Sequence, residues 1–172
     1  MPSPVGHALA GLAGGWLIRG NRIDAPAGRR EAVLFAGLGT LADLDLLFAL
    51  HRGPTHGLGA AVLAGAFAWL PSTQATASSR ITLAIACMLA YGSHSLLDWL
   101  GSDTSPPFGV MALWPITREY YESSLRVFMA ISRRIWQPER FWVQNFSALW
   151  RELWILVPVV VGVGVLRRAR RT

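Results

Sequence analysis

The sequence of 172 residues contains no lysine, a single cysteine and few charged side chains. Charged residues make up 15% of the chain, against about 25% in an average soluble domain, whereas apolar residues make up 52%. Because Cys87 has no second cysteine to pair with, the disulfide-stapled class of small secreted domains is excluded. The length fits one domain, and the apolar composition excludes a disordered chain and favours a membrane protein.

Several functional motifs are also missing. The chain has no glycine-rich phosphate loop, no serine nucleophile elbow and no CxxC pair, so nucleotide hydrolysis and thiol chemistry find no support. All 16 basic residues are arginine, and the net charge is +6. These arginines are scattered over several loops, whereas a nucleic-acid footprint gathers them on one surface, so we expect no nucleic-acid partner.

Five apolar segments can be compared with a bilayer, whose core of about 30 Å requires roughly 20 helical residues. They are residues 5–18, 32–50, 57–70, 81–100 and 148–166. The first and third have 14 residues each, which is short for a lone span and better suited to a helix packed inside a bundle. We therefore expect an all-α integral membrane bundle with about 4–5 membrane-embedded helices. The oligomeric state stays open.

The arginines also predict an orientation. If the passes alternate, nine arginines near the ends of the segments fall on one side, and cytoplasmic loops are the ones enriched in arginine. The favoured orientation therefore puts the C-terminus in the cytoplasm and the N-terminus outside. The start of the chain lacks the basic region of a cleaved signal, so the first segment should stay in the protein. Met1, residues 43–56 and residues 94–103 then share the outer face.

The connection before the last segment is rich in arginine and aromatic residues. Arg126, Arg133 and Arg140 recur every seven residues, a spacing that puts them on one face of a continuous helix. We expect amphipathic interfacial helices here, interrupted at Pro138, that either capture a lipid substrate or form a solvated basic face over the site. The single domain, 1–172, then divides into a motif-bearing bundle (1–116), an interfacial helical segment (117–147) and a C-terminal membrane helix with a basic tail (148–172).

All four histidines lie in or beside the segments that meet at the outer face, and three of the five aspartates, Asp43, Asp45 and Asp98, lie within or at the ends of apolar runs. A carboxylate near the middle of a bilayer helix costs about 2.5–3.5 kcal/mol on insertion scales, so such residues usually face a partner or a water-filled cavity. A divalent cation is the simplest partner that histidines and aspartates can share.

His94 and Asp98 have the clearest geometry, because residues four apart on a helix lie on one face. A hydrogen bond on the helix surface is the alternative. Asp43 and Asp45 are about 200° apart on a helix, so both can face one ion only if the helix breaks. Asp43 is then the better ligand, and Asp45 either caps the next turn or holds a metal-bound histidine.

The segment from His51 to His56 holds two histidines around a Gly-Pro turn, so one would reach in from the loop and the other from the first helical turn. Arg52 lies between them and suits a bidentate grip on phosphate or carboxylate, although an ion pair with a lipid headgroup is the alternative. His7, taken alone, is an interfacial histidine. Only the predicted topology brings it to the same face as the other candidates.

Several strings of the sequence together resemble a known family. They are Met1-Pro-Ser-Pro-Val-Gly-His7, Leu41-Ala-Asp-Leu-Asp45, His51-Arg-Gly-Pro-Thr-His56, Tyr91-Gly-Ser-His-Ser-Leu-Leu-Asp98 and Leu113-Trp-Pro115. In order and spacing they look like the membrane-bound metal-dependent hydrolases, also described as inner-membrane-associated hydrolases, across about residues 1–120. Ala42 stands where the family usually has proline, and Gly57 stands where it usually has serine. A more distant similarity is to the zinc-dependent phospholipase C and P1 nuclease group.

The resemblance implies a metal-dependent hydrolase in the bacterial inner membrane. The expected metal ligands are His7, Asp43, His51, His56, His94 and Asp98. Asp45 or Asp98 would accept a proton from the water, Arg52 would hold the substrate anion, and Asp103 and Trp114 would line the site. Mixed nitrogen and oxygen ligands favour zinc first, with manganese or iron as alternatives.

The expected partners are membrane lipids and a small-molecule or lipid-like substrate, such as a phosphoester. The alternative is a non-catalytic membrane protein that binds or transports a metal.

Overall fold

The computed structural model describes the chain except residues 20–24, 49–51, 71–75, 105 and 170–172. It contains five α-helices: α1 (Pro4–Ile18), α2 (Pro26–Leu41), α3 (Leu58–Trp69), α4 (Ala77–Trp99) and α5 (Pro138–Ala169). Two short 3-10 helices, η1 (Ala42–Phe48) and η2 (Pro54–His56), separate α2 from α3. No strand occurs among the described residues. The expected all-α fold is therefore confirmed for the described residues, and each of the five apolar segments overlaps one α-helix.

Local signals start the helices. Pro4 occupies the first turn of α1, where its missing N–H costs nothing, and the Ser3 side chain caps that turn by accepting from the Gly6 amide. Thr76 caps α4 in the same way through the Ser79 amide. Pro138 was expected to interrupt a helix, and the structure places it at the start of α5, where proline is tolerated.

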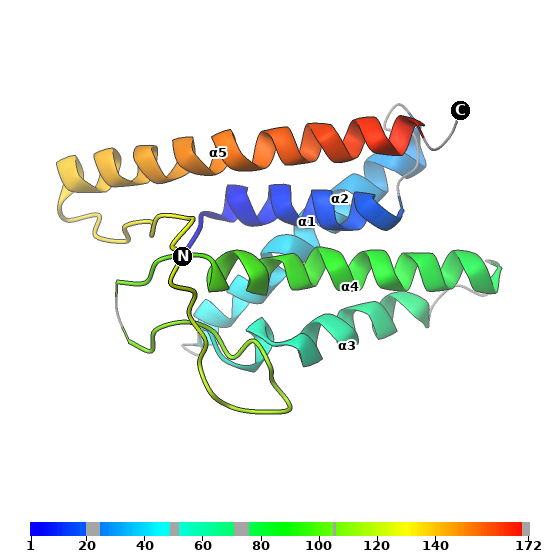
Figure 1. Ribbon diagram of the computed structural model, residues 1–172, viewed down its shortest axis with the longest axis horizontal. Helices are drawn as coiled ribbons and strands as arrows, with labels where there is room; N and C mark the ends of the chain where they lie inside the picture. Colours follow the sequence, from blue (N-terminus) through cyan, green and yellow to red (C-terminus); the bar gives the residue numbers. More distant parts are fainter. Residues whose placement is uncertain (20–24, 49–51, 71–75, 105, 170–172) are drawn as a thin grey trace.

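The helices form a bundle with α1 and α4 at its centre (Figure 1). α1 packs against α2, α4 and α5, whereas α3 packs against α4. Successive helices run in alternating directions, so α1 begins and α4 ends at one end of the bundle. The core between the ends is apolar and contains Trp16, Phe35, Ala86, Cys87 and Ala90.

Two helices, α4 and α5, are long and apolar enough to cross a membrane. α1 and α3 are apolar but shorter, since at about 1.5 Å per residue neither reaches the roughly 30 Å of a bilayer core. Large apolar side chains such as Val33, Phe67 and Val165 are mostly exposed on the outside of the bundle. An outward apolar face of this kind is expected where lipid surrounds a protein. The number of embedded helices beyond these two stays a prediction.

The interfacial helices expected within residues 117–147 are only partly present. Residues 117–137 form no helix, and Arg126 has a φ of 43°, which an α-helix does not allow. The backbone of this segment bonds instead to distant parts of the chain: the Ser123 amide donates to Trp99, the Phe128 amide to Leu100 and the Ile131 amide to Met1. These hydrogen bonds to distant residues take the place of the bonds within a helix, so the helix predicted from the seven-residue spacing of the arginines does not form. The expected helix is present from Pro138 onward, as the first turns of α5.

Candidate metal centre

Five side chains meet at the end of the bundle where α1 begins and α4 ends. His7 lies in the first turns of α1, Asp43 in η1, and His56 at the end of η2. His94 and Asp98 lie one turn apart near the end of α4. We call these five residues the His–Asp cluster. Two α-helix ends and two 3-10 helices therefore contribute to one place, although up to 91 positions of sequence separate the residues.

Asp98 lies at the centre of this cluster. Its Oδ1 atom is 3.3 Å from His7 Nε2, and its Oδ2 atom is 3.2 Å from His94 Nε2 and 3.4 Å from His56 Nε2. The carboxylate and all three imidazoles are inaccessible to solvent. The rings of His7 and His94 are stacked with centroids 3.8 Å apart.

Asp43 approaches the cluster from the side. Its Oδ1 atom lies 3.7 Å from His94 Nε2 and 4.0 Å from His56 Nε2. Two sets of ligand atoms, His7 with His94 and Asp98, and Asp43 with His56 and His94, each lie within 4.8 Å of one another. The Asp43 side chain is 20% exposed, so the cluster faces solvent on this side.

Several facing atoms of the cluster have no hydrogen-bond partner within the described parts of the chain: His7 Nε2, His94 Nε2, Asp43 Oδ1 and both carboxylate oxygens of Asp98. Their separations of 3.2–3.7 Å bring them together without hydrogen-bond alignment. Buried polar atoms are normally satisfied. A divalent cation among these nitrogens and oxygens would satisfy them together, so the residues present fit a metal ion.

A second layer of contacts orients two of the imidazoles. His94 Nδ1 lies 2.7 Å from the Gly39 carbonyl oxygen, and since a carbonyl only accepts, Nδ1 donates the proton and Nε2 keeps a lone pair for the cluster. His56 Nδ1 lies 3.2 Å from Asp45 Oδ2, which also accepts from the Thr55 hydroxyl at 2.6 Å. Carboxylates and carbonyls behind metal-bound histidines commonly play this part.

The loop that carries His56 is tied to α4. The Tyr91 hydroxyl donates to the Thr55 carbonyl oxygen at 2.8 Å, one helical turn before His94. Tyr91 therefore fixes the position of η2 along the axis of α4. Asp43 and Asp45 both reach the cluster region because α2 ends at Leu41 and the chain continues as a 3-10 helix. The helix break that Asp43 and Asp45 require thus occurs, even though Ala42 stands where the family that the sequence resembles usually has proline.

Arg52 belongs to a neighbouring network. Its guanidinium Nη2 atom lies 3.0 Å from Asp103 Oδ1, its Nε donates to the Met1 sulfur at 3.2 Å, and its Nη1 donates to the Pro107 carbonyl oxygen. Asp103 also accepts from the Gly109 amide at 2.7 Å. Burial lowers the pKa of the Met1 amine, a shift that the carboxylates of Asp98 and Asp103 oppose. The two networks are therefore close enough to interact electrostatically.

Trp114 packs on the start of α3. A Cβ atom added to Gly57 would lie 2.8 Å from the Trp114 Cβ atom, and one added to Gly59 would meet the Trp114 ring. A side chain at position 57 would therefore be crowded by this loop. The contacts of Trp114 thus shape the loop next to His56. His51, the remaining expected ligand, lies outside the described residues.

Sequence reasoning gave Glu152 no role, yet this carboxylate holds the start of α1. Glu152 is fully buried in α5, accepts from the Ser3 amide at 2.7 Å and also accepts from the Ser3 hydroxyl. Ser3 in turn caps the helix that carries His7. The one available signal was a carboxylate within an apolar segment, which requires a partner but does not say which one.

The fold and the site define a class: a helical membrane protein with a candidate metal centre at one end of its bundle. A family model described as "YdjM inner membrane protein" matches residues 1–170. The chain belongs to this family and is thus an inner membrane protein. No curated protein and no solved structure matches the chain. The family match agrees with the expected membrane class, whereas the hydrolase type stays a proposal.

Proposed function

We propose that this protein is a membrane-bound metal-dependent hydrolase. The observation that carries the proposal is the convergence of three imidazoles and two carboxylates in the His–Asp cluster, in which facing atoms of His7, His94, Asp43 and Asp98 have no hydrogen-bond partner within the described parts of the chain. His7, His56, His94, Asp98 and Asp43 would hold one divalent cation, with zinc favoured over manganese or iron. A bound cation of this kind lowers the pKa of its water toward about 7 and polarises a phosphoryl or acyl oxygen.

The chain's own residues have distinct parts in this proposal. Asp98 and the three histidines are sealed from solvent, whereas Asp43 is partly exposed, so water and substrate would reach the cluster past Asp43. A carboxylate at that opening can accept a proton from the attacking water. Asp45 positions His56, because its own oxygen is bonded to Thr55 and lies against the imidazole. Arg52, held by Asp103, would face the anionic part of a phosphoester.

A second candidate function is a non-catalytic metal-binding membrane protein. The burial of His7, His94 and Asp98 favours it, since structural metal sites are closed and catalytic sites keep an open position. Metal transport has less support. A transport path needs polar groups through the bilayer, whereas the core beyond the cluster is formed by Phe35, Ala86 and Ala90.

Metal analysis followed by turnover tests these alternatives. Full-length protein in non-ionic detergent would be stripped with a chelator, reloaded with Zn²⁺, Mn²⁺ or Fe²⁺, and assayed for bound metal and for hydrolysis of bis(p-nitrophenyl) phosphate. We expect about one ion per chain and turnover that chelation abolishes. His94→Ala and Asp98→Asn should lose both, while Cys87→Ala on the same helix should keep both. Bound metal without turnover would favour the non-catalytic function, and no bound metal would refute both.

A further inference from the structure

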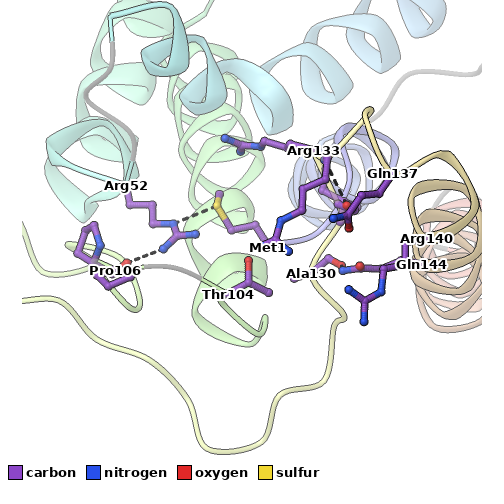
Figure 2. Close-up of a pocket in the computed structure, with 13 residues that line it drawn as sticks. Met1, Arg52, Thr104, Pro106, Ala130, Arg133, Gln137, Arg140 and Gln144 are labelled. Atoms are coloured by element: carbon purple, nitrogen blue, oxygen red, sulfur yellow. Dashed lines mark hydrogen bonds between the residues drawn. The ribbon is translucent and has the colours of Figure 1, made fainter.

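A cavity of about 580 Å³ lies beside the end of the bundle that holds the His–Asp cluster. Its volume is within the range of small-molecule sites. Figure 2 shows Met1 in the middle, Arg52 and Thr104 toward one side, and Arg133, Arg140 and Gln144 toward the other. Residues 130–134 and Gln137, which lie in a segment expected from the sequence to be helical, form much of the wall as non-helical chain. We call this space the arginine cavity.

The charge of its wall points to an anion. Four arginines line the cavity: Arg52, Arg133, Arg134 and Arg140. No carboxylate lines the cavity among the described residues, and the Asp103 carboxylate pairs with Arg52 behind the wall. Thr104, Gln137 and Gln144 add hydroxyl and amide groups. Guanidinium groups bind phosphate oxygens in bidentate fashion, and neutral donors complete such sites.

The length of α5 indicates where the cavity lies relative to the lipid bilayer. This helix has 32 residues, about 48 Å at 1.5 Å per residue, which exceeds a bilayer core of about 30 Å. If the basic turn at Arg167 and Arg168 lies at one interface, roughly the first ten residues extend into the opposite headgroup region. Arg140 and Gln144 are in this part, one turn apart and facing the cavity.

The face of these α5 turns that points away from the cavity also agrees with a position at the level of the lipid headgroups. Trp142 and Phe146 lie about 200° around the helix from Arg140 and Gln144, and both are largely exposed. Exposed aromatic rings gather at the level of lipid headgroups. The first turns of α5 therefore present aromatic rings outward and polar groups to the cavity.

We propose that the arginine cavity binds the phosphate group of a phosphate ester, so that the substrate of the neighbouring centre is held by its phosphate. This inference rests on the proposed hydrolase function where it treats the bound phosphate ester as a substrate. The phosphate-binding site itself does not depend on that function. Arg52 joins the two places, because it lines the cavity and lies four residues before His56. The phosphate belongs either to a lipid headgroup or to a soluble ester, and the chemistry of recognition is the same.

Binding to the full-length protein in non-ionic detergent tests the proposal without any turnover. Native mass spectrometry would compare dioleoyl phosphatidylglycerol with dioleoylglycerol, which has the same acyl chains but no phosphate, and calorimetry would follow inorganic phosphate. We expect the phospholipid to bind at least about tenfold more tightly than dioleoylglycerol. The R133Q/R134Q/R140Q variant should lose that preference and lose phosphate binding.

The matched control is R29Q/R30Q/R168Q, which removes the same charge from exposed positions at the other end of the bundle. It should bind both probes like the unmodified chain. Equal binding by the cavity variant, equal loss by the control, or no binding by the unmodified chain would each overturn the proposal. If this triple variant is not monodisperse, R134Q/R140Q replaces it, and unchanged binding there has the same meaning.

The two sources of phosphate are separated by comparing affinities. Phosphatidylglycerol bound at least about tenfold more tightly than inorganic phosphate indicates a lipid headgroup, and equal affinity indicates a soluble ester. Both results support the cavity as a phosphate site. Metal content is measured on the same samples. An unmodified chain that holds metal but binds no phosphate contradicts only this inference, whereas an unmodified chain that binds phosphate but no metal contradicts only the hydrolase.

Discussion

Gly39 contributes to the candidate metal centre without a side chain. Its carbonyl accepts from His94, and a Cβ atom at this position would lie 2.2 Å from the His7 carbonyl oxygen and 2.9 Å from the Cα atom of Gly11. The absence of a side chain lets the backbones of α1 and α2 approach, which brings His7 beside His94. One glycine thus positions two histidines.

We expect Gly39→Ala to push α1 away from α2 and to destabilise the protein by about 1–3 kcal/mol through overpacking. The His7 imidazole would move away from Asp98, so bound metal should also fall. The thermal unfolding midpoint and the metal content measure the two effects. Gly37→Ala is the matched control, because a Cβ there meets nothing within 4 Å on the same helix. If both variants behave alike, the close approach has no part in the site.

Asp45 acts on the cluster through His56. Asp45→Asn keeps the size of the side chain but removes the charge behind the imidazole, and loss of such a partner lowers metal affinity by about 10–100-fold. We expect Asp98→Asn, at the centre of the cluster, to cost more. Zinc affinity measured by competition with a chelating dye separates the two variants. An Asp45→Asn affinity equal to that of the unmodified chain would exclude this positioning role.

At the scale of elements, α5 is more than a candidate membrane span. Its Glu152 side chain reaches the first turn of α1, whose N–H groups carry partial positive charge, and so places a carboxylate where the helix dipole favours it. A Cβ added at Gly6 would lie 2.6 Å from Glu152 Oε2, so glycine is needed for this contact. The helix that carries His7 is therefore anchored to the last helix of the chain.

Glu152→Ala leaves the Ser3 donors buried without their acceptor, which costs about 1–3 kcal/mol. We expect a lower unfolding midpoint and weaker metal binding, because the start of α1 loosens. Glu139→Gln, at an exposed position in the first turn of the same helix, should change neither. Thermal unfolding with and without Zn²⁺ provides the measurement, and an unchanged midpoint for Glu152→Ala would contradict the anchoring role.

The segment before α5 shows how far a repeat in the sequence can mislead. Arg126, Arg133 and Arg140 are spaced as on one helical face, yet the first two lie outside any helix. Met1 accepts from Ile131, and Leu100 accepts from Phe128, so the backbone of this segment is satisfied by tertiary contacts. Helical spacing predicts a helix only when the backbone N–H and C=O groups of the segment must form hydrogen bonds with one another and have no partners elsewhere in the chain.

At the scale of the whole molecule, the bundle has two different ends. One carries the His–Asp cluster and the arginine cavity. At the other, Arg19 bonds to Glu31 at 2.8 Å and to the Ser79 carbonyl at 2.6 Å, near the basic turn of Arg167 and Arg168. Since arginine-rich ends usually face the cytoplasm, we expect the cluster end to face outward.

Cysteine labelling checks this orientation. Thr104→Cys at the cavity end should react with a membrane-impermeant maleimide in spheroplasts, whereas Thr76→Cys before α4 should react only after the membrane is permeabilised. Both positions are exposed, and the native Cys87 is buried, so the background should be low. The reverse pattern of labelling would place the cluster in the cytoplasm.

The sequence alone determined the helices and the candidate ligands. Apolar segments, caps and prolines act over a few residues, so the five α-helices and the pairing of His94 with Asp98 follow from local chemistry. The alternation of helices also put His7, Asp43 and His56 at the same end as that pair. Local rules could decide this much because each acts within one element or its direct neighbour.

Only the tertiary structure decided which atoms meet. The bond from Ser3 to Glu152, the pairing of Arg52 with Asp103 and the non-helical course of residues 117–137 all join parts of the chain that are far apart in sequence. Their partners depend on how closely helices approach, which is set by glycines such as Gly39 and by the packing of whole surfaces. Periodicity along one helix carries no information about that approach.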